Sequence, residues 1–133
     1  MRAPSAAAMT VPSDDGDGQR TQRQASGAAG EARALAHLQQ HGLVLVDRNF
    51  LCKVGEIDLI MRERHSLVFI EVRARAKGRH GSAADSITPA KQRRLLRAAQ
   101  RYLQRFRVPP ACRFDVVAID GETLTWLKDA IQG

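Results

Sequence analysis

The chain has 133 residues, of which 44% are hydrophobic and 26% are charged, and its formal net charge is +7. This length is enough for one domain with its own core, and the composition is that of an ordinary globular protein. No apolar run approaches the roughly 20 residues that cross a bilayer, which excludes a membrane-spanning protein.

The cysteine content and the N-terminal residues favour a reducing compartment. The first 20 residues have no apolar core of the kind that a signal peptide contains, and they soon turn acidic. Cys52 and Cys112 lie far apart and lack the spacing of a zinc site. We therefore expect free thiols and a cytoplasmic protein.

Positive charge is concentrated in one segment. Residues 88–107 contain seven basic side chains and no acidic one, which equals the net charge of the whole chain. Guanidinium groups suit phosphate oxygens, so DNA is the expected partner. The predicted nucleic-acid-binding residues are Lys91, Arg93, Arg94, Arg97 and Arg101. A helix face that is merely solvated is the alternative.

The N-terminal residues predict a tail followed by a helix. Residues 1–24 contain almost no large apolar side chains, which predicts a disordered tail and a single domain over residues 25–133. Ser26 as N-cap and Gly42 after the last turn predict a first helix over residues 27–41. Its inward face is expected to comprise Ala28, Ala32, Leu35 and Leu38.

The remaining elements follow from alternation and capping. Alternating apolar residues predict five strands, over residues 43–50, 55–61, 67–74, 113–120 and 123–127. A Gly-rich loop is expected over residues 75–87. Thr88 as N-cap and Pro89 in the first turn predict a second helix that runs to about residue 106. The order α-β-β-β-α-β-β predicts an α/β fold, a mixed sheet flanked by helices.

Two neighbouring strands carry acids on one predicted face. In the expected hairpin, Asp58 lies directly opposite Glu71, and Arg73 shares their face. The same alternation places Ile57 and Leu59 together on the other face. Opposed carboxylates destabilise a sheet unless something compensates their charge.

A divalent cation would compensate the two carboxylates. Mg²⁺, or Mn²⁺ in its place, accepts one or two carboxylates, with water and phosphate oxygens as its other ligands. Such an ion activates water and stabilises negative charge in the transition state, while Arg73 holds the scissile phosphate. Glu31, on the site-facing side of the first helix, is a third candidate ligand. The pattern predicts a metal-dependent phosphodiesterase with Asp58, Glu71 and Arg73 as its catalytic residues.

Four blocks of sequence resemble a known family. The blocks GEIDLI, VFIEVRAR, TPAKQRRLLRAAQRYL and RFDVVAID together resemble the YraN family of uncharacterised bacterial proteins, over about residues 27–127. The first two blocks also resemble the PD-(D/E)xK signature of restriction-endonuclease-like nucleases, which include archaeal Holliday-junction resolvases. The resemblance implies a restriction-endonuclease-like core and a role in binding or cutting DNA.

The resemblance also implies roles for individual residues. By position, Asp58 and Glu71 match the metal-binding acids, and the carbonyl of Val72 matches a backbone ligand. Arg73 stands where the superfamily more often has Lys. Because a guanidinium does not lose its proton near neutral pH, the role left for Arg73 is charge stabilisation.

Alternatives to an endonuclease or resolvase-like protein stay open. Asp58 and Glu71 in an edge hairpin can simply be solvated, each paired with Arg73 or Arg75. The chain is then a catalytically silent nucleic-acid-binding module, or a subunit that meets an acidic protein or a second copy of itself. Asp115 is expected to be structural, paired with Arg113 or capping a neighbouring element.

Overall fold

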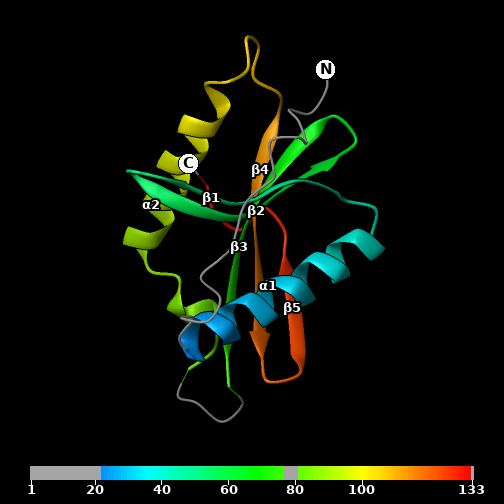
Figure 1. Ribbon diagram of the computed structural model, residues 1–133, viewed down its shortest axis with the longest axis vertical. Helices are drawn as coiled ribbons and strands as arrows, with labels where there is room; N and C mark the ends of the chain where they lie inside the picture. Colours follow the sequence, from blue (N-terminus) through cyan, green and yellow to red (C-terminus); the bar gives the residue numbers. More distant parts are fainter. Residues whose placement is uncertain (1–21, 77–80, 133) are drawn as a thin grey trace.

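The computed structural model describes residues 22–76 and 81–132, with side chains from residue 27 onward (Figure 1). In chain order, its elements are α1 (Gln22–Gln40), β1 (Val44–Cys52), β2 (Gly55–Glu63), β3 (Ser66–Arg75), the 3₁₀ helix η3 (Ala84–Ser86), α2 (Pro89–Leu103), β4 (Cys112–Asp120) and β5 (Thr123–Leu127). The predicted α/β class is confirmed, and η3 is an addition within the predicted loop. The predicted tail lies outside the described residues, except for residues 22–24, which belong to α1. Because α1 begins at Gln22, the prediction that the helix starts at residue 27 with Ser26 as N-cap is wrong.

Five strands form one mixed sheet in the order β1-β2-β3-β4-β5. The pairs β1–β2, β2–β3 and β4–β5 are antiparallel, whereas β3 and β4 are parallel. A parallel pair needs a crossover connection, and α2 supplies it. The sheet therefore carries its acidic hairpin, β2–β3, between the edge strand β1 and the parallel strand β4.

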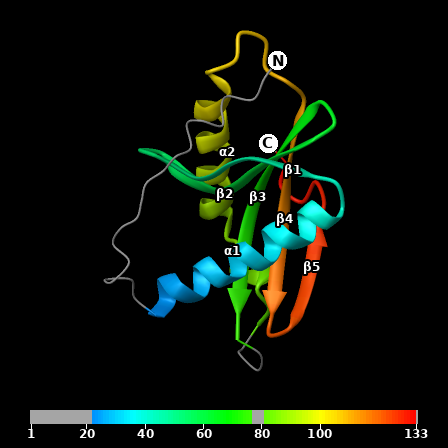
Figure 2. The same cartoon turned by 45° about the vertical axis from the view of Figure 1, so that its right-hand side comes forward.

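The two helices cover opposite faces of the sheet (Figure 2). The core on the side of α1 includes Ala34, Leu38, Leu59, Met61, Val68, Ile70, Val72, Val117 and Ile119. The core on the side of α2 includes Ile57, Ile60, Leu67, Phe69, Leu95, Ala98, Ala99, Tyr102 and Val116. Because β2 and β3 are covered on both faces, their middle residues form continuous apolar runs.

Neither α1 nor α2, the α-helices within the part of the chain that the structure describes, is long and apolar enough to cross a bilayer. Cys52 and Cys112 are both free, as expected.

The C-terminus of α1 is set by Gly42, as predicted. Gly42 has a φ of 92°, a left-handed conformation that glycine adopts without steric cost. The N–H of Leu43 donates to the carbonyl of Leu38, and the N–H of Gly42 donates to the carbonyl of Gln39, both at 3.1 Å. This is a Schellman motif, and Leu38 and Leu43 complete it by packing in the same core.

The buried face of α1 differs from the predicted one. Gly30, Ala34 and Leu38 are buried, whereas Ala32 is exposed. Gly30 faces the sheet where the helix approaches β3, because a Cβ on Gly30 would lie only 3.3 Å from the Cβ of Ala74. Glu31, the next residue after Gly30, is half-buried beside this contact.

The N-terminus of α2 is capped as predicted. Thr88 Oγ1 accepts a hydrogen bond from the backbone N–H of Lys91 at 3.2 Å, and Pro89 is the first helical residue. The helix ends at Leu103, one turn earlier than predicted. Its buried residues are Leu95, Ala98, Ala99 and Tyr102.

The strand β2 changes the direction of its side chains at Asp58. Ile57 packs on the side of α2 and Leu59 on the side of α1, so the prediction that they share a face is wrong. On the neighbouring strand, Asn49 lies between the partners of these two residues and has a φ of 53°. A left-handed residue interrupts regular strand twist. Asp58 therefore stands at a kink in the hairpin.

Asp115 is structural, as predicted. Its buried carboxylate accepts hydrogen bonds from Arg113 Nε at 3.0 Å, Trp126 Nε1 at 2.9 Å and the backbone N–H of Asp129 at 2.8 Å. Arg113 also pairs with Glu63. These donors satisfy a charge that would otherwise be costly to bury, and they tie the C-terminal residues to β4.

Candidate active site

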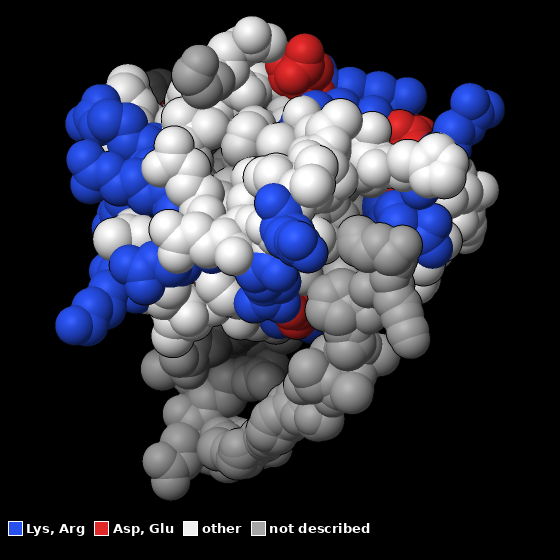
Figure 3. Space-filling model, turned by 90° about the horizontal axis from the view of Figure 1, so that it is seen from above, with Lys and Arg blue, Asp and Glu red and all other residues white. Residues whose placement is uncertain are grey.

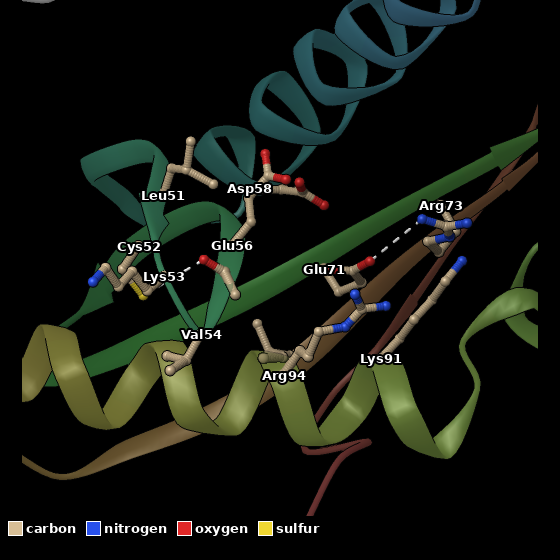
Figure 4. A pocket seen from close by; sticks show the side chains of 12 residues that line it. Leu51, Cys52, Lys53, Val54, Glu56, Asp58, Glu71, Arg73, Lys91 and Arg94 are labelled. Carbon is tan, nitrogen blue, oxygen red and sulfur yellow. Dashed lines mark hydrogen bonds and ion pairs between the residues drawn. The ribbon is translucent and has the colours of Figure 1, made fainter.

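A cleft of about 370 Å³ lies between the β1–β2 turn, β3 and α2 (Figure 4). Its lining includes three carboxylates, those of Glu56, Asp58 and Glu71. Its cationic side chains are Lys53, Arg73, Lys91 and Arg94. The cleft thus combines acids that suit a cation with basic groups that suit a phosphate.

Gly55 determines how closely the β1–β2 turn approaches α2. A Cβ on Gly55 would lie 2.4 Å from the backbone carbonyl oxygen of Arg94. Glycine permits this approach without strain, because the obstructing atom belongs to the main chain of a helix and cannot move unless the helix itself shifts. The contact sets the width of the cleft on this side.

Asp58 and Glu71 come together through the register of the β2–β3 hairpin. The pairing runs from Glu63 opposite Ser66 to Leu59 opposite Ile70. Asp58 and Glu71 follow next in this register, and both line the cleft.

The backbone of β3 holds Asp58 in place. Asp58 Oδ2 accepts a hydrogen bond from the backbone N–H of Val72 at 2.8 Å. A side-chain oxygen thereby satisfies a β3 donor beyond the point at which the described β2–β3 pairing ends. The side chain of Asp58 is fixed at the edge of the cleft.

Burial raises the pKa of Glu71 to about 8, and the charge of Asp58 adds to this effect. Arg73 and Lys91 act in the opposite direction, because their positive charges favour the carboxylate. Only 15% of the side chain of Glu71 is exposed, so water compensates little of its charge. Without a bound cation, Glu71 holds a proton at neutral pH.

Two more acids near this point have raised pKa values. Burial raises the pKa of Asp58 to about 6, although the hydrogen bond from Val72 opposes the change. Burial, followed by the charge of Asp58, raises the pKa of Glu31 to about 7. The structure therefore brings Glu31, from α1, into the electrostatic field of the predicted acidic pair.

Arg73 lies beside Glu71, as the alternation of β3 predicts. Arg73 Nη1 is 3.5 Å from Glu71 Oε2, and 31% of the Arg73 side chain is exposed (Figure 4). The distance is long for a charge-assisted hydrogen bond. The guanidinium is therefore close enough to influence the carboxylate and exposed enough to meet a ligand.

The chemistry of these donors fits a hard divalent cation. Carboxylate oxygens are the ligands that Mg²⁺ and Mn²⁺ prefer, and raised pKa values mark acids that lack enough compensating charge. Within residues 22–76 and 81–132, no group of three or more His, Cys, Asp or Glu side chains is arranged to hold a metal ion. A cation at this place would depend on one or two carboxylates and on water.

The predicted ligand roles of Asp58, Glu71, Glu31 and the Val72 carbonyl stay predictions. For Val72, the structure describes a contact of the N–H group, which donates to Asp58. Val72 also packs in the core on the side of α1.

Glu56 is absent from the predicted site residues, but it belongs to this cleft. Its charge raises the pKa values of Glu31, Asp58 and Glu71. The signal was present in the sequence, because Glu56 precedes Asp58 by two residues in the same strand. An exposed acid at the end of a strand usually faces only water, so its position in the sequence does not by itself indicate a site.

The predicted nucleic-acid-binding residues divide into two groups. Lys91 and Arg94 line the cleft, and Figure 4 shows them rising from α2 toward Glu71 and Arg73. The other three, Arg93, Arg97 and Arg101, are exposed on the outer side of α2.

Figure 3 shows basic side chains projecting from the side of the molecule that α2 occupies. Arg105 differs from these residues, because its guanidinium stacks 3.8 Å from the ring centre of Tyr102 and reaches Asp47 at 4.0 Å. Arg105 therefore fastens α2 to β1.

The fold and the site define a class, that of small α/β domains with an acidic cleft bordered by a basic helix. The chain belongs to the uncharacterised protein family UPF0102, whose model matches residues 30–119. The matched residues contain the whole cleft. The predicted resemblance to the YraN family is thereby confirmed, whereas the likeness to nucleases stays a prediction.

Bacterial relatives extend over most of the chain. A UPF0102 protein of Herminiimonas arsenicoxydans is 58% identical over 113 residues, which cover 85% of this chain and 91% of the relative. A UPF0102 protein of a Janthinobacterium strain is also 58% identical, and the match covers 85% of this chain and 92% of the relative. A UPF0102 protein of Alkalilimnicola ehrlichii is 56% identical over 107 residues, with 79% and 85% covered.

Proposed function

We propose that this protein is a metal-dependent DNA endonuclease or resolvase-like protein that binds a phosphodiester in the acidic cleft. The observation that carries the proposal is the juxtaposition of Asp58 and Glu71, two acids with raised pKa values that line one cleft. Both carboxylates can be charged together in this cleft only when a cation compensates them. The helix α2, which has five basic residues and no acidic one, stands beside the cleft and suits a polyanion.

The cofactor proposed is Mg²⁺, or Mn²⁺ in its place. Asp58 and Glu71 would hold it, with Glu31 and the Val72 carbonyl as further ligands, and when bound it supplies positive charge and an activated water. Because burial raises the pKa of Glu71 to about 8, binding a cation there is linked to proton release.

The cationic residues have distinct proposed roles. Arg73, beside Glu71, contacts the scissile phosphate and stabilises its developing charge. Lys91 and Arg94 hold the same strand from the side of α2. The exposed residues Arg93, Arg97 and Arg101 contact phosphates farther along the backbone.

A cleavage assay tests the proposal. Labelled linear, flap and four-way-junction DNA is incubated with the full chain in Mg²⁺, in Mn²⁺ and in EDTA. We expect cleavage that needs the metal and falls at least ~100-fold in Asp58→Asn and in Glu71→Gln. The matched control is Glu122→Gln, since Glu122 is an exposed acid in the β4–β5 turn. Cleavage that persists undiminished in both site variants would exclude this cleft.

A catalytically silent DNA-binding module is the second candidate. The observation that favours it is Arg73, which cannot exchange protons where related signatures more often have Lys. This candidate predicts salt-sensitive DNA binding in EDTA that survives Asp58→Asn. Log affinity falls as log salt concentration rises. Reversing the charge of Arg94, Arg97 and Arg101 together should make this negative slope shallower by roughly 2–3.

The control for the charge reversal is Arg62→Glu, because Arg62 is exposed near the opposite end of β2. Equal affinity in the triple variant and in the control would remove α2 as the binding surface. Binding to a protein partner, with none to DNA at low salt, would favour an interaction subunit.

A further inference from the structure

We propose that Ser86 is a positioning residue for Arg73, and that it fixes the orientation of the guanidinium at the border of the cleft. This inference rests on the proposed function for its catalytic consequence, but the contact itself does not depend on that function. Ser86 lies in η3, in the connection between β3 and α2. No sequence pattern connects it with the acidic cleft.

The hydroxyl of Ser86 has a defined orientation. Ser86 Oγ donates a hydrogen bond to the carbonyl of Ala83 at 2.6 Å and accepts one from Arg73 Nε at 3.0 Å. A hydroxyl has one proton to donate, and here it donates that proton in the hydrogen bond to the Ala83 carbonyl. The lone pairs of the oxygen are therefore directed toward Arg73, and the hydroxyl cannot rotate without losing a hydrogen bond.

The segment that carries Ser86 is held on the sheet. The backbone N–H of Ala83 donates to Asp120 Oδ1 at 2.7 Å, and Ala83 is fully buried. Asp120 ends β4 and lies opposite Arg75 of β3. A chain of hydrogen bonds thus runs from Asp120 through Ala83 and Ser86 to the guanidinium of Arg73.

The hydrogen bond from Arg73 to Ser86 holds the arginine side chain in one rotamer beside the cleft. An arginine side chain has many rotamers, and the 3.5 Å approach to Glu71 is too long to select one. The hydrogen bond at Nε selects the rotamer and leaves both Nη groups without a bond to Ser86, with Nη1 beside Glu71. A guanidinium fixed before the substrate arrives needs no reorganisation when charge develops.

The first test observes the Arg73 side chain directly and needs no activity. In ¹H–¹⁵N spectra of the full chain, the Nε–H of Arg73 should exchange slowly with water. We expect exchange at least ~10-fold faster in Ser86→Ala and restored protection in Ser86→Thr, which keeps the hydroxyl. The matched control is Ser82→Ala, because Ser82 lies in the same connection and bonds to Asp85 instead. Unchanged exchange in Ser86→Ala would overturn the proposal.

The second test separates positioning from a general effect on folding. Ser86→Ala should lower kcat about 10-fold while DNA affinity in EDTA stays within about 2-fold, and Ser86→Thr should restore kcat. In an Arg73→Ala background, Ser86→Ala should cause no further loss, because the two residues act as a unit. An equal loss in both backgrounds would contradict positioning. If the unmodified chain cuts no DNA, the proposed function fails, and the exchange experiment still decides the role of Ser86.

Discussion

The carboxylate of Asp58 accepts a hydrogen bond from the backbone N–H of Val72, 2.8 Å away, immediately beyond the point at which the described β2–β3 pairing ends. One side chain therefore both completes the hydrogen bonding of β3 and presents its charge to the cleft. This double role separates two kinds of substitution at residue 58.

Asp58→Asn should fold normally, whereas Asp58→Ala should be less stable than Asp58→Asn by about 1 kcal/mol. The amide oxygen of Asn can still accept from Val72, but Ala leaves that partly buried N–H without a partner. Urea denaturation at pH 7 measures the difference. Equal free energies of unfolding would show that the hydrogen bond contributes nothing measurable, and the normal fold of Asp58→Asn qualifies it for the cleavage assay.

Stability should fall as the pH rises from about 4.5 to 8. Burial raises the pKa of Glu71 from 4.5 to about 8, so in this range the folded protein binds a proton that the unfolded chain has released. The raised pKa values of Glu31 and Asp58 act in the same direction. The free energy of unfolding therefore decreases with increasing pH until Glu71 is ionised in both states.

Glu71→Gln isolates the contribution of that carboxyl group. At pH 8.5 this variant should be more stable than the unmodified chain by at least ~1 kcal/mol. At pH 4 the two proteins should have the same free energy of unfolding. Urea denaturation across the pH series provides the measurement, with Glu122→Gln as the control. A variant that is less stable at pH 8.5 would contradict a buried, uncompensated charge.

Divalent cations should raise the melting temperature at pH 8 more than at pH 5. At pH 8 Asp58 and Glu31 are ionised and Glu71 is half-ionised, whereas at pH 5 protons compete with the metal. When the free metal concentration is 100 times its Kd, binding raises the free energy of unfolding by about 2.7 kcal/mol. Differential scanning calorimetry with Mn²⁺ measures it, and the increase should vanish in Glu71→Gln. The same increase in that variant would place the metal elsewhere.

Gly55→Ala should destabilise the fold by roughly 1–3 kcal/mol and weaken DNA binding. Its Cβ would lie 2.4 Å from the Arg94 carbonyl oxygen, so either the β1–β2 turn or α2 must move. Gly27→Ala is the matched control, because a Cβ there meets nothing within 4 Å and the residue is in α1. The free energy of unfolding of Gly27→Ala should rise by about 0.5–1 kcal/mol, because Ala favours a helix more than Gly does. Thermal and urea unfolding compare the two, and equal stabilities would contradict the close approach at Gly55.

Local signals in the sequence predicted most element positions. Thr88 and Pro89 begin α2, and Gly42 ends α1, because capping and left-handed turns depend on neighbouring residues. A turn centred between Arg64 and His65 predicted the register of β2 and β3, and Glu63 pairs with Ser66 as that turn requires. Alternation failed between Ile57 and Leu59, since the left-handed Asn49 twists the hairpin there.

The sequence by itself determined the family, the element order, and the acids and bases available to a site, because these depend on composition and on short-range patterns. Tertiary structure alone decided that Lys91 and Arg94 face the acidic cleft, that α1 packs so that the charge of Asp58 raises the pKa of Glu31, and that Ser86 reaches Arg73. Each of these relationships joins separate elements, and each follows from how the helices rotate and pack on a kinked hairpin.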